Sequence, residues 1–348
     1  MQLPLVTLGF VPLALGFLRT APDISPLDIA YTSLGPVPNV TDAQGFDAPA
    51  RNTNSYWIAH WLTAENGHDY FAIACHAQLV NNISTLISLL DITMGDYFGS
   101  QIVSPGRLSS TAYGGNFNGL DMYAATDDQF STLVTTSNIS GASFNLTSTP
   151  RGPNLYHGGS TSFFWGTGIT NELAAPEMYV TGTITTLDGS KVNVTSNQSI
   201  SWLDRQWGPG IASGGWLWFD IILEDGIKIA AWFVNPVSGS DRSQSFATIL
   251  YPDSRHEVVW LDPNLVSSEP ITSDITGIVY NTSYQIKMPI KNAEFNITMP
   301  VKVGEMPLLT APSSTDSILE GFSLIEGIFD GLPAKGFGLI EIKTGLNV

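Results

Sequence analysis

The residues best suited to chemistry lie together in one short segment. Residues 199–208 read Ser-Ile-Ser-Trp-Leu-Asp-Arg-Gln-Trp-Gly, so Asp204 and Arg205 are adjacent and lie between Trp202 and Trp207. Only 13% of the residues in the chain are charged, and an ion-forming pair among indoles indicates a partly desolvated polar site. Burial and neighbouring charges change the proton affinity of a carboxyl group in such a site. The segment is therefore the first candidate for acid–base chemistry.

An extended strand would separate the two charged residues. Side chains alternate between the faces of a strand, so Trp202, Asp204 and Gln206 would share one face. Arg205 and Trp207 would lie on the other face. Asp204 is then a candidate general acid or base, or a carboxylate that accepts backbone hydrogen bonds. Arg205 is either a second functional group or a polar contact between domains.

Each of these two residues needs a partner of its own. The candidates are the charged or titratable residues that stand in otherwise apolar segments with a strand pattern, namely Glu177, Glu320, Glu341 and His76. A histidine in such a segment is either an ordinary buried side chain or a functional one. The sequence does not decide between these partners.

A second segment combines indoles with a carboxyl group. On a strand over residues 216–223, Trp216, Trp218 and Asp220 would share one face. A wall of indoles suits a flat hydrophobic molecule in a barrel cavity. The alternative is an aromatic sheet face that packs on a neighbouring domain.

The sequence predicts neither a metal nor a cofactor. No spacing among the five histidines matches a zinc pattern, and Cys75 is the only cysteine, which also rules out an intrachain disulfide. The chain has no Gly-x-Ser-x-Gly elbow, no Walker loop and no dinucleotide-binding fingerprint. Serine-triad hydrolysis, phosphoryl transfer and nicotinamide chemistry are therefore disfavoured.

Composition limits the partners. The formal net charge of -17 would repel phosphate backbones, so we expect no nucleic-acid partner. The apolar start of the chain, residues 1–16, resembles a secretory signal peptide and is too short to span a bilayer comfortably. We expect a monomer in the secretory pathway or outside the cell, without a stable membrane span. Eight Asn-x-Ser/Thr sequons are candidate glycosylation sites: Asn39, Asn82, Asn138, Asn145, Asn193, Asn197, Asn281 and Asn296.

The sequence predicts an all-β fold. Alternating apolar runs with intervening Asn-Gly or Asp-Gly turns indicate hairpins over residues 56–77, 178–195 and 216–234. Residues 84–94 fit a strand or a short helix, and residues 317–329 are interpreted as strand. Trp57 lies ten residues before Gly67, and Trp216 lies ten residues before Gly226. This repeat suggests tandem domains, residues 17–200 and 201–348, with a ligand site near their junction, although two long hairpins can match by chance.

Four longer motifs stand out in the sequence. They begin at Leu155 (Leu-Tyr-His-Gly-Gly), Phe164 (Phe-Trp-Gly-Thr-Gly-Ile-Thr), Pro176 (Pro-Glu-Met-Tyr-Val-Thr-Gly-Thr) and Ser201 (Ser-Trp-Leu-Asp-Arg-Gln-Trp-Gly). These motifs resemble those of one family, the fungal kievitone hydratase-like branch of the lipocalin-like superfamily that includes bacterial carotenoid hydratases. The resemblance covers roughly residues 50–343 and implies two lipocalin-like antiparallel β-barrels in tandem. The family motif commonly has Tyr where this chain has Leu203.

The resemblance also implies an activity on a hydrophobic prenylated or polyketide-type small molecule. A cofactor-free hydratase or dehydratase is favoured, a pericyclase of the Diels-Alderase type is the first alternative, and a non-enzymatic carrier is the second. For a hydratase, Asp204 would be the acid, and Glu177, Glu320 or Glu341 would hold the water. For a pericyclase, Arg205 or Gln206 would donate a hydrogen bond to a substrate carbonyl. We expect the substrate to contact Trp202, Gln206, Trp207, Trp216, Trp218 and His76.

Overall fold

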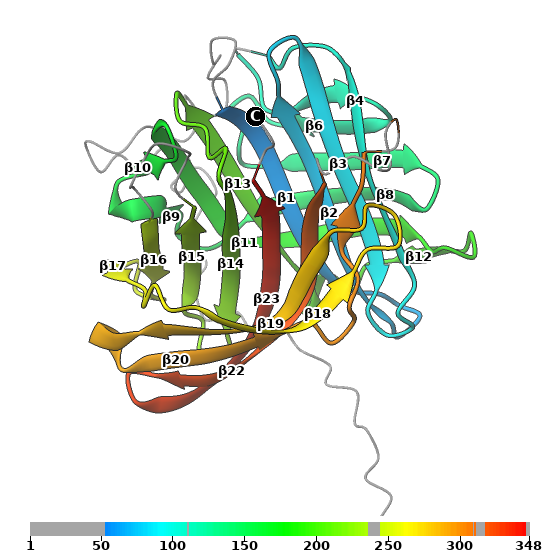
Figure 1. Cartoon of the computed structure of the whole chain (residues 1–348). Helices are drawn as coiled ribbons and strands as arrows, with labels where there is room; N and C mark the ends of the chain where they lie inside the picture. The colour runs from blue at the N-terminus through cyan, green and yellow to red at the C-terminus, as the bar shows by residue number, and fades with distance from the viewer. Residues whose placement is uncertain (1–52, 110, 236–243, 309, 311–316, 346–348) are drawn as a thin grey trace, which may run out of the picture.

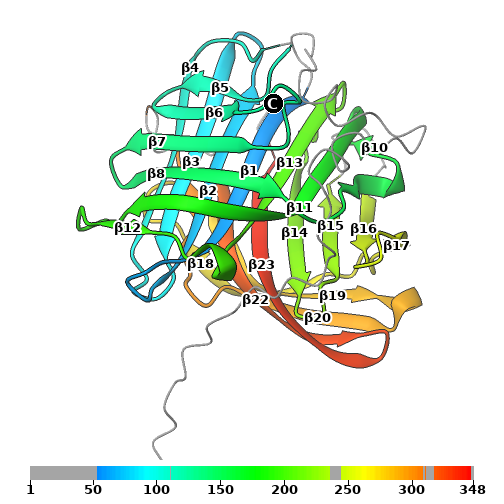
Figure 2. The same cartoon turned by 180° about the vertical axis from the view of Figure 1, so that it is seen from behind.

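The chain folds into two large antiparallel β-sheets (Figures 1 and 2). The computed structural model describes residues 53–109, 111–235, 244–308, 310 and 317–345, so the predicted signal peptide and the Asn39 sequon lie outside it. The elements in this part of the chain are strands and three short 3₁₀ turns, η1 (His157–Gly159), η2 (Ser196–Gln198) and η3 (Pro289–Lys291). The all-β prediction is confirmed. None of the described residues form a helix of the length and hydropathy needed to cross a membrane.

The first sheet has 13 strands. Its main path runs β4-β3-β2-β1-β13-β11-β8-β7-β6-β5, and β9, β10 and β12 also pair with β11. The strands are β1 (Thr53–Thr63), β2 (Asp69–Gln78), β3 (Asn82–Asp91), β4 (Tyr97–Pro105), β5 (Gly115–Phe117), β6 (Leu120–Ala124), β7 (Leu133–Ile139), β8 (Ala142–Pro150), β9 (Leu155–Tyr156), β10 (Ser162–Trp165), β11 (Gly168–Thr185), β12 (Lys191–Asn193) and β13 (Ile200–Gly208).

The second sheet has 10 strands. Its path runs β17-β16-β15-β14-β23-β22-β20-β19-β18, with β21 beside β22. The strands are β14 (Gly215–Leu223), β15 (Lys228–Val234), β16 (Gln244–Leu250), β17 (His256–Trp260), β18 (Val266–Thr272), β19 (Val279–Met288), β20 (Ala293–Thr298), β21 (Glu305–Met306), β22 (Ile318–Phe329) and β23 (Leu332–Thr344).

The two sheets share one strand order. In each, the first four strands pair in sequence, and the last strand returns to pair with the first: β13 with β1, and β23 with β14. This match supports the duplication that the hairpin spacing suggested. The chain passes from one sheet to the other between Gly208 and Gly215, after the Asp-Arg motif, whereas the sequence interpretation placed the domain boundary before that motif.

The predicted hairpins are present, and the ambiguous segments are strands. β1 pairs with β2, β11 with β12, and β14 with β15. The segment read as strand or helix is β3, which hydrogen-bonds to β2 on one side and to β4 on the other. The segment over residues 317–329 contains β22, and β23 is the final strand.

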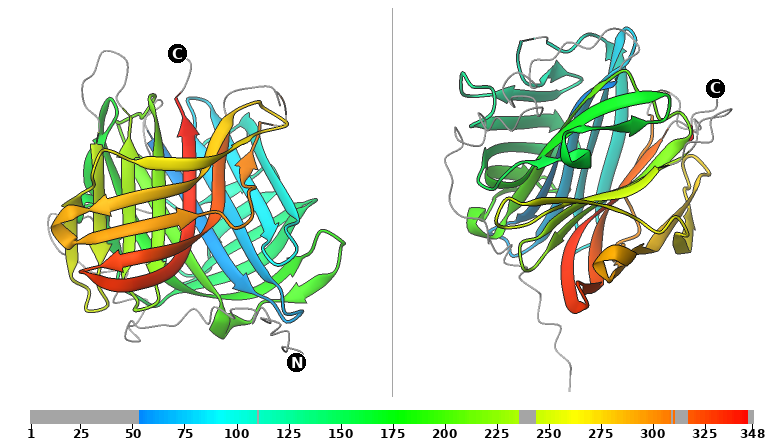
Figure 3. Two further views of the ribbon diagram at one scale, coloured as in Figure 1. Left: turned by 60° about the horizontal axis from the view of Figure 1, so that its bottom comes forward. Right: turned by 90° about the vertical axis from the view of Figure 1, so that its left-hand side faces the viewer.

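Three apolar clusters form the core. One fills the concave side of the first sheet and includes Tyr56 and Leu203, and one fills the second sheet and includes Phe219. The third lies between the sheets, and we call it the interface layer; the right-hand view of Figure 3 shows the two sheets side by side. Large side chains of the interface layer are Trp57, Trp61, Phe71, Trp202, Trp218, Trp232 and Phe337.

A β-bulge in β11 determines where Glu177 points. The register of β11 against β13 shifts between Ala175 and Met178, and both of these side chains lie in the first-sheet core. Regular alternation would have placed Glu177 with Ala175, inside the first sheet, but the extra residue turns it towards the second sheet. There its carboxylate forms a buried ion pair with Lys228 of β15. Glu177 therefore links the two sheets.

Breaking this ion pair should destabilise the protein strongly. Glu177→Gln leaves the Lys228 ammonium buried without its carboxylate, which should lower the free energy of unfolding by about 3 kcal/mol or more. Guanidinium chloride unfolding measures the effect. Lys287→Met is the matched control, because it breaks the half-exposed Lys287–Glu294 pair and should cost less than about 1 kcal/mol. Equal losses in the two variants would contradict a linking role for Glu177.

Candidate active site

The motif strand β13 presents its two charged residues to different environments, as alternation predicted. Trp202 lies in the interface layer, and its indole N–H donates to Asp204 Oδ1 at 2.9 Å. Arg205 lies on the opposite face, fully buried, with its guanidinium 4.3 Å from the ring centre of Tyr56 and 5.3 Å from that of Trp207. Asp204 thus faces the second sheet, whereas Arg205 and Trp207 belong to the interior of the first.

Two further buried residues meet Asp204. Glu172 of β11 lies opposite Gln206 in the register, diagonal to Asp204 on the same face. His157 begins the turn η1, directly after β9, which pairs with β11 at Leu173 and Ala174.

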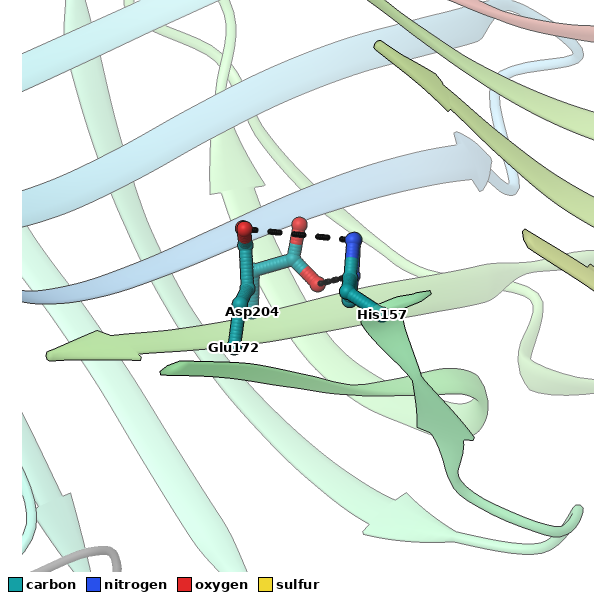
Figure 4. Close-up of side chains that lie close together, drawn as sticks. All are labelled: His157, Glu172 and Asp204. Atoms are coloured by element: carbon teal, nitrogen blue, oxygen red, sulfur yellow. Dashed lines mark ion pairs between the residues drawn. The ribbon is translucent and has the colours of Figure 1, made fainter. Parts of the chain in front are cut away.

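The three side chains form a compact cluster (Figure 4). His157 Nδ1 is 3.8 Å from Glu172 Oε2, and His157 Nε2 is 3.6 Å from Asp204 Oδ1. All three residues are buried. We call this set the His-Glu-Asp cluster. It combines a histidine with two carboxyl groups in an apolar layer, which is a composition suited to proton transfer.

The η1 turn depends on glycine. Gly158 and Gly159 have φ values of 65° and 82°, in the left-handed region that glycine adopts without steric cost. The amide N–H of Gly158 donates to Thr248 Oγ1 of β16 at 2.9 Å. A first-sheet turn is therefore fixed by a second-sheet strand, and both sheets determine the position of His157.

Three carboxyl groups of the second sheet face the same layer. They are Asp220 of β14, Glu320 of β22 and Glu341 of β23, and each is at most 7% exposed. Glu341 lies directly opposite both Trp218 and Glu320 in the sheet. The interface layer thus holds five buried carboxyl groups, Asp204 and the four around it.

Burial and mutual repulsion raise the pKa values of these carboxyl groups. Burial raises the pKa of Glu172 well above its ordinary value, and the charges of Asp204 and Glu341 add to the rise. Burial, together with the Asp204 charge, raises the pKa of Asp220 in the same way. Burial and, next to it, the charge of Glu341 raise the pKa of Glu320. Burial raises the pKa of Glu341 itself to about 8. Neutral carboxylic acids therefore persist here at neutral pH.

Indole N–H groups hold the polar atoms of the layer in place. Trp57 donates to Glu320 Oε2 at 2.8 Å, Trp216 donates to Glu341 Oε1, and Trp232 donates to His157 Nδ1 at 3.0 Å. Other buried atoms of the layer have no hydrogen-bond partner among the described residues. They are His157 Nε2, Glu172 Oε2, Trp218 Nε1, both carboxyl oxygens of Asp220, and Glu320 Oε1. Buried polar atoms of this kind take partners from water or a ligand.

A surface pocket approaches the His-Glu-Asp cluster. Its volume is about 220 Å³, and it is lined by Gly158, Phe163, Phe164, Gln244, Phe246, Val258, Val259 and Trp260. Gly158 is the residue after His157, and the Phe163 ring stacks on the His157 ring with 6.2 Å between centres. Typical ligand pockets measure about 300–1,000 Å³. The pocket therefore accommodates part of a small hydrophobic molecule, one aromatic ring away from the cluster.

The geometry of the His-Glu-Asp cluster resembles a metal site, but its hydrogen bonds do not fit one. Each of the three side chains offers one possible ligand atom, and these three atoms lie within 4.8 Å of one another. A metal-bound histidine normally donates its second ring N–H to an acceptor. Here Nδ1 instead accepts the N–H of Trp232, an indole that can only donate. Neutral His157 then carries its proton on Nε2, the atom that faces Asp204, and offers a metal no free lone pair.

Six residues of the predicted site lie in or near the interface layer. Asp204, Glu341, Trp202 and Trp218 are buried, and Trp216 and Gln206 are partly buried. The others lie elsewhere. Arg205 and Trp207 are inside the first sheet, and Glu177 pairs with Lys228. His76 is also inside the first sheet, where Nδ1 lies 3.1 Å from Thr85 Oγ1 and burial lowers the pKa of the ring to about 4.

The predicted site did not include Glu172, His157 or Trp232. Glu172 stands beside an apolar Leu-Ala-Ala run, and the same signal that singled out Glu177 could have found it. His157 stands before two glycines in a loop, and its sequence carries no sign of its partners. These residues meet Asp204 only through strand pairing and the contact between the sheets.

The raised pKa of Glu341 predicts a pH-dependent stability. The folded protein binds this proton more tightly than the unfolded chain, so the contribution to stability is full below the unfolded-state pKa and is lost as pH rises through about 8. Between about pH 5 and pH 8 the free energy of unfolding should fall by on the order of 3 kcal/mol, and Glu341→Gln should make this fall smaller. Denaturant unfolding at several pH values measures it. Glu326→Gln, at an exposed position, should leave the fall unchanged.

We also expect that no divalent metal is required. Dialysis against a chelator should leave the melting temperature unchanged, and added Zn²⁺ should not bind tightly in calorimetry. Tight stoichiometric binding that is lost in Glu172→Gln would show that the His-Glu-Asp cluster holds a metal after all.

Comparison with known proteins places this chain in a family. Kievitone hydratase of Fusarium solani subsp. phaseoli is 23% identical over 313 residues, covering 88% of this chain and 87% of that protein. Dehydratase asqC of Emericella nidulans is 23% identical over 335 residues, covering 90% and 91%. The crystal structure of kievitone hydratase from Nectria haematococca superposes with a TM-score of 0.79 at 21% identity, covering 94% and 97%, and shows the same fold. The AttH-like family model matches residues 118–344, and the chain therefore belongs to the AttH-like family.

Proposed function

We propose that this protein is a hydro-lyase that adds water to, or removes it from, a neutral hydrophobic metabolite in the interface layer. The observation that carries the proposal is the His-Glu-Asp cluster, in which the carboxyl group of Glu172, its pKa raised by burial, lies next to Asp204 in an apolar, indole-lined layer. The names of the two relatives, a hydratase and a dehydratase, support the same reaction class.

The substrate class follows from the charges and the lining. The chain carries a net charge of -17 and the interface layer is apolar, so charge repulsion and desolvation both disfavour an anionic substrate. The surface pocket offers aromatic and aliphatic side chains to an apolar molecule. We propose a prenylated or polyketide-type small molecule with a carbon–carbon double bond or a hydroxyl group.

Hydration would proceed by protonation of the alkene and then attack of water. The carboxylic acid of Glu172 gives its proton to one alkene carbon, and the π electrons form the new C–H bond. A cation develops on the other carbon, where indole faces of the layer stabilise it. Water attacks this carbon while Asp204 accepts a proton from it, and the product is an alcohol. Dehydration follows the same path in reverse. This proposal transfers the role of acid from Asp204 to Glu172 and makes Asp204 the base.

Substitution of either carboxyl group should abolish most activity. Glu172→Gln and Asp204→Asn should each lower kcat by about 10²–10⁴-fold on a neutral prenylated phenol such as 4-hydroxy-3-prenylacetophenone, because each removes a proton-transfer group. Mass spectrometry in ¹⁸O-labelled water should show one heavy oxygen in the hydrated product. Asp121→Asn, on a first-sheet strand outside the interface layer, is the matched control and should retain full activity.

The same measurement separates the alternatives. A product that has the mass of the substrate and contains no heavy oxygen would indicate a pericyclase. A bound ligand recovered unchanged from a panel of prenylated phenols and polyene alcohols would indicate a carrier. Full activity of both carboxyl variants would refute the assigned roles.

We further propose that the protein enters the secretory pathway. The seven sequons within the described residues, from Asn82 to Asn296, are all partly or fully exposed, so their side chains are accessible to glycosylation. A mobility shift after glycosidase treatment of the secreted protein would test this proposal.

A further inference from the structure

We infer that His157 acts as a hydrogen-bond donor through Nε2, and that Trp232 is the positioning residue that fixes this tautomer. The inference rests on the proposed function for its catalytic meaning, but the tautomer itself follows from a single contact. The Trp232 indole N–H lies 3.0 Å from His157 Nδ1, and both side chains are buried. Because an indole only donates, Nδ1 must be the unprotonated acceptor. A neutral imidazole then carries its one proton on Nε2.

The protonated nitrogen faces the reaction site. Nε2 lies 3.6 Å from Asp204 Oδ1 and has no hydrogen-bond partner among the described residues. A water or substrate hydroxyl that lies beside the two atoms, within hydrogen-bond distance of both, would accept a hydrogen bond from Nε2–H and give its own proton to Asp204. His157 therefore holds and orients the oxygen, and Asp204 alone removes the proton.

Two groups compete for the opposite side of the ring. Trp232 approaches Nδ1 to 3.0 Å, within hydrogen-bond distance, whereas Glu172 Oε2 stays at 3.8 Å, outside it. If Trp232 were absent, Glu172 would be the nearest acceptor and would favour a proton on Nδ1. Nε2 would then be a lone-pair acceptor and could not donate to the oxygen. The identity of one indole thus decides which role the imidazole has.

Packing leaves Trp232 little freedom to move. Its ring stacks on Trp218 at 5.3 Å between centres, contacts Trp165 edge-on at 5.0 Å, and lies 5.7 Å from Phe163. Trp232 belongs to β15 of the second sheet, whereas His157 belongs to a first-sheet turn. Close packing of the two sheets therefore maintains the tautomer.

Ring-nitrogen NMR tests the tautomer directly. In protein labelled with ¹⁵N-histidine, His157 should show the signature of a proton on Nε2, with the signal assigned by its loss in His157→Gln. Trp232→Phe should shift the proton to Nδ1. Trp165→Phe is the matched control, because it removes an indole of the same aromatic cluster that makes no hydrogen bond to His157, and the tautomer should stay unchanged. A proton on Nδ1 in the native protein would overturn the inference.

Kinetics tests the role of the donor. A glutamine amide nitrogen can occupy the place of Nε2 and donate but cannot act as a base, whereas an asparagine amide nitrogen reaches only the place of Nδ1. On the same prenylated phenol, His157→Gln should lose no more than about 10-fold in kcat, and His157→Asn about 100-fold or more. Trp232→Phe should lower kcat with little change in KM. Equal losses in the two histidine variants would overturn the donor role.

Failure of the inference and failure of the proposed function can be told apart. The NMR measurement needs no substrate, so the tautomer is read even if the protein proves not to be a hydro-lyase. Conversely, hydro-lyase activity with a proton on Nδ1 would refute only the role of Trp232. A Trp232→Phe protein that keeps both its Nε2 proton and its full kcat would refute it as well.

Discussion

The chemistry of this protein depends on desolvation of carboxyl groups where two sheets meet. A carboxyl group is ordinarily ionised at neutral pH, and an isolated charge in an apolar layer is costly. The protein buries several of these groups in one layer, and the cost is met by protonation and by hydrogen bonds from indoles. Asp204 lies at the centre of this arrangement because its charge contributes to the raised pKa of its neighbours. The packing that excludes water thus also provides the proton donors.

Indoles serve two purposes in this layer. Their rings fill the space between the sheets with polarisable faces, and their N–H groups each provide one donor without introducing a charge. An Arg or Lys in the same place would lower the pKa of a nearby carboxyl group and remove the neutral acid. This distinction explains why Arg205, three bonds along the backbone from Asp204, has to face the other way. Lys228, a cation that lies between the sheets, is already paired with Glu177. Lys343, on the Glu341 face of β23, donates to the carbonyl of Ser317, and its charge only partly offsets the effect of burial on the pKa of Glu341.

The sequence predicts the strands better than the site. Alternation and Asp-Gly or Asn-Gly turns are local signals, so the hairpins β1–β2 and β14–β15 and the opposite orientations of Asp204 and Arg205 follow from them. The partners of Asp204 are set by non-local terms. Glu172 reaches it through the pairing of β11 with β13. Pro176 marks the bulge that redirects Glu177, but a proline does not tell which partner the following side chain meets. Nor does alternation tell which face of β2 lies inside the first sheet, and the sequence therefore cannot exclude His76 from the site.

The shared strand order of the two sheets bears on how the molecule comes apart. Each sheet has an apolar cluster of its own, so each can keep a folded interior, whereas the layer between them holds all of the titratable groups of the site. Opening along this layer exposes carboxyl groups that ionise in water and then repel one another, which opposes closure. A rise in pH therefore weakens the structure along the plane that contains the site. Loss of function would precede loss of secondary structure, and the protein could be inactive while its circular dichroism spectrum still shows two intact sheets.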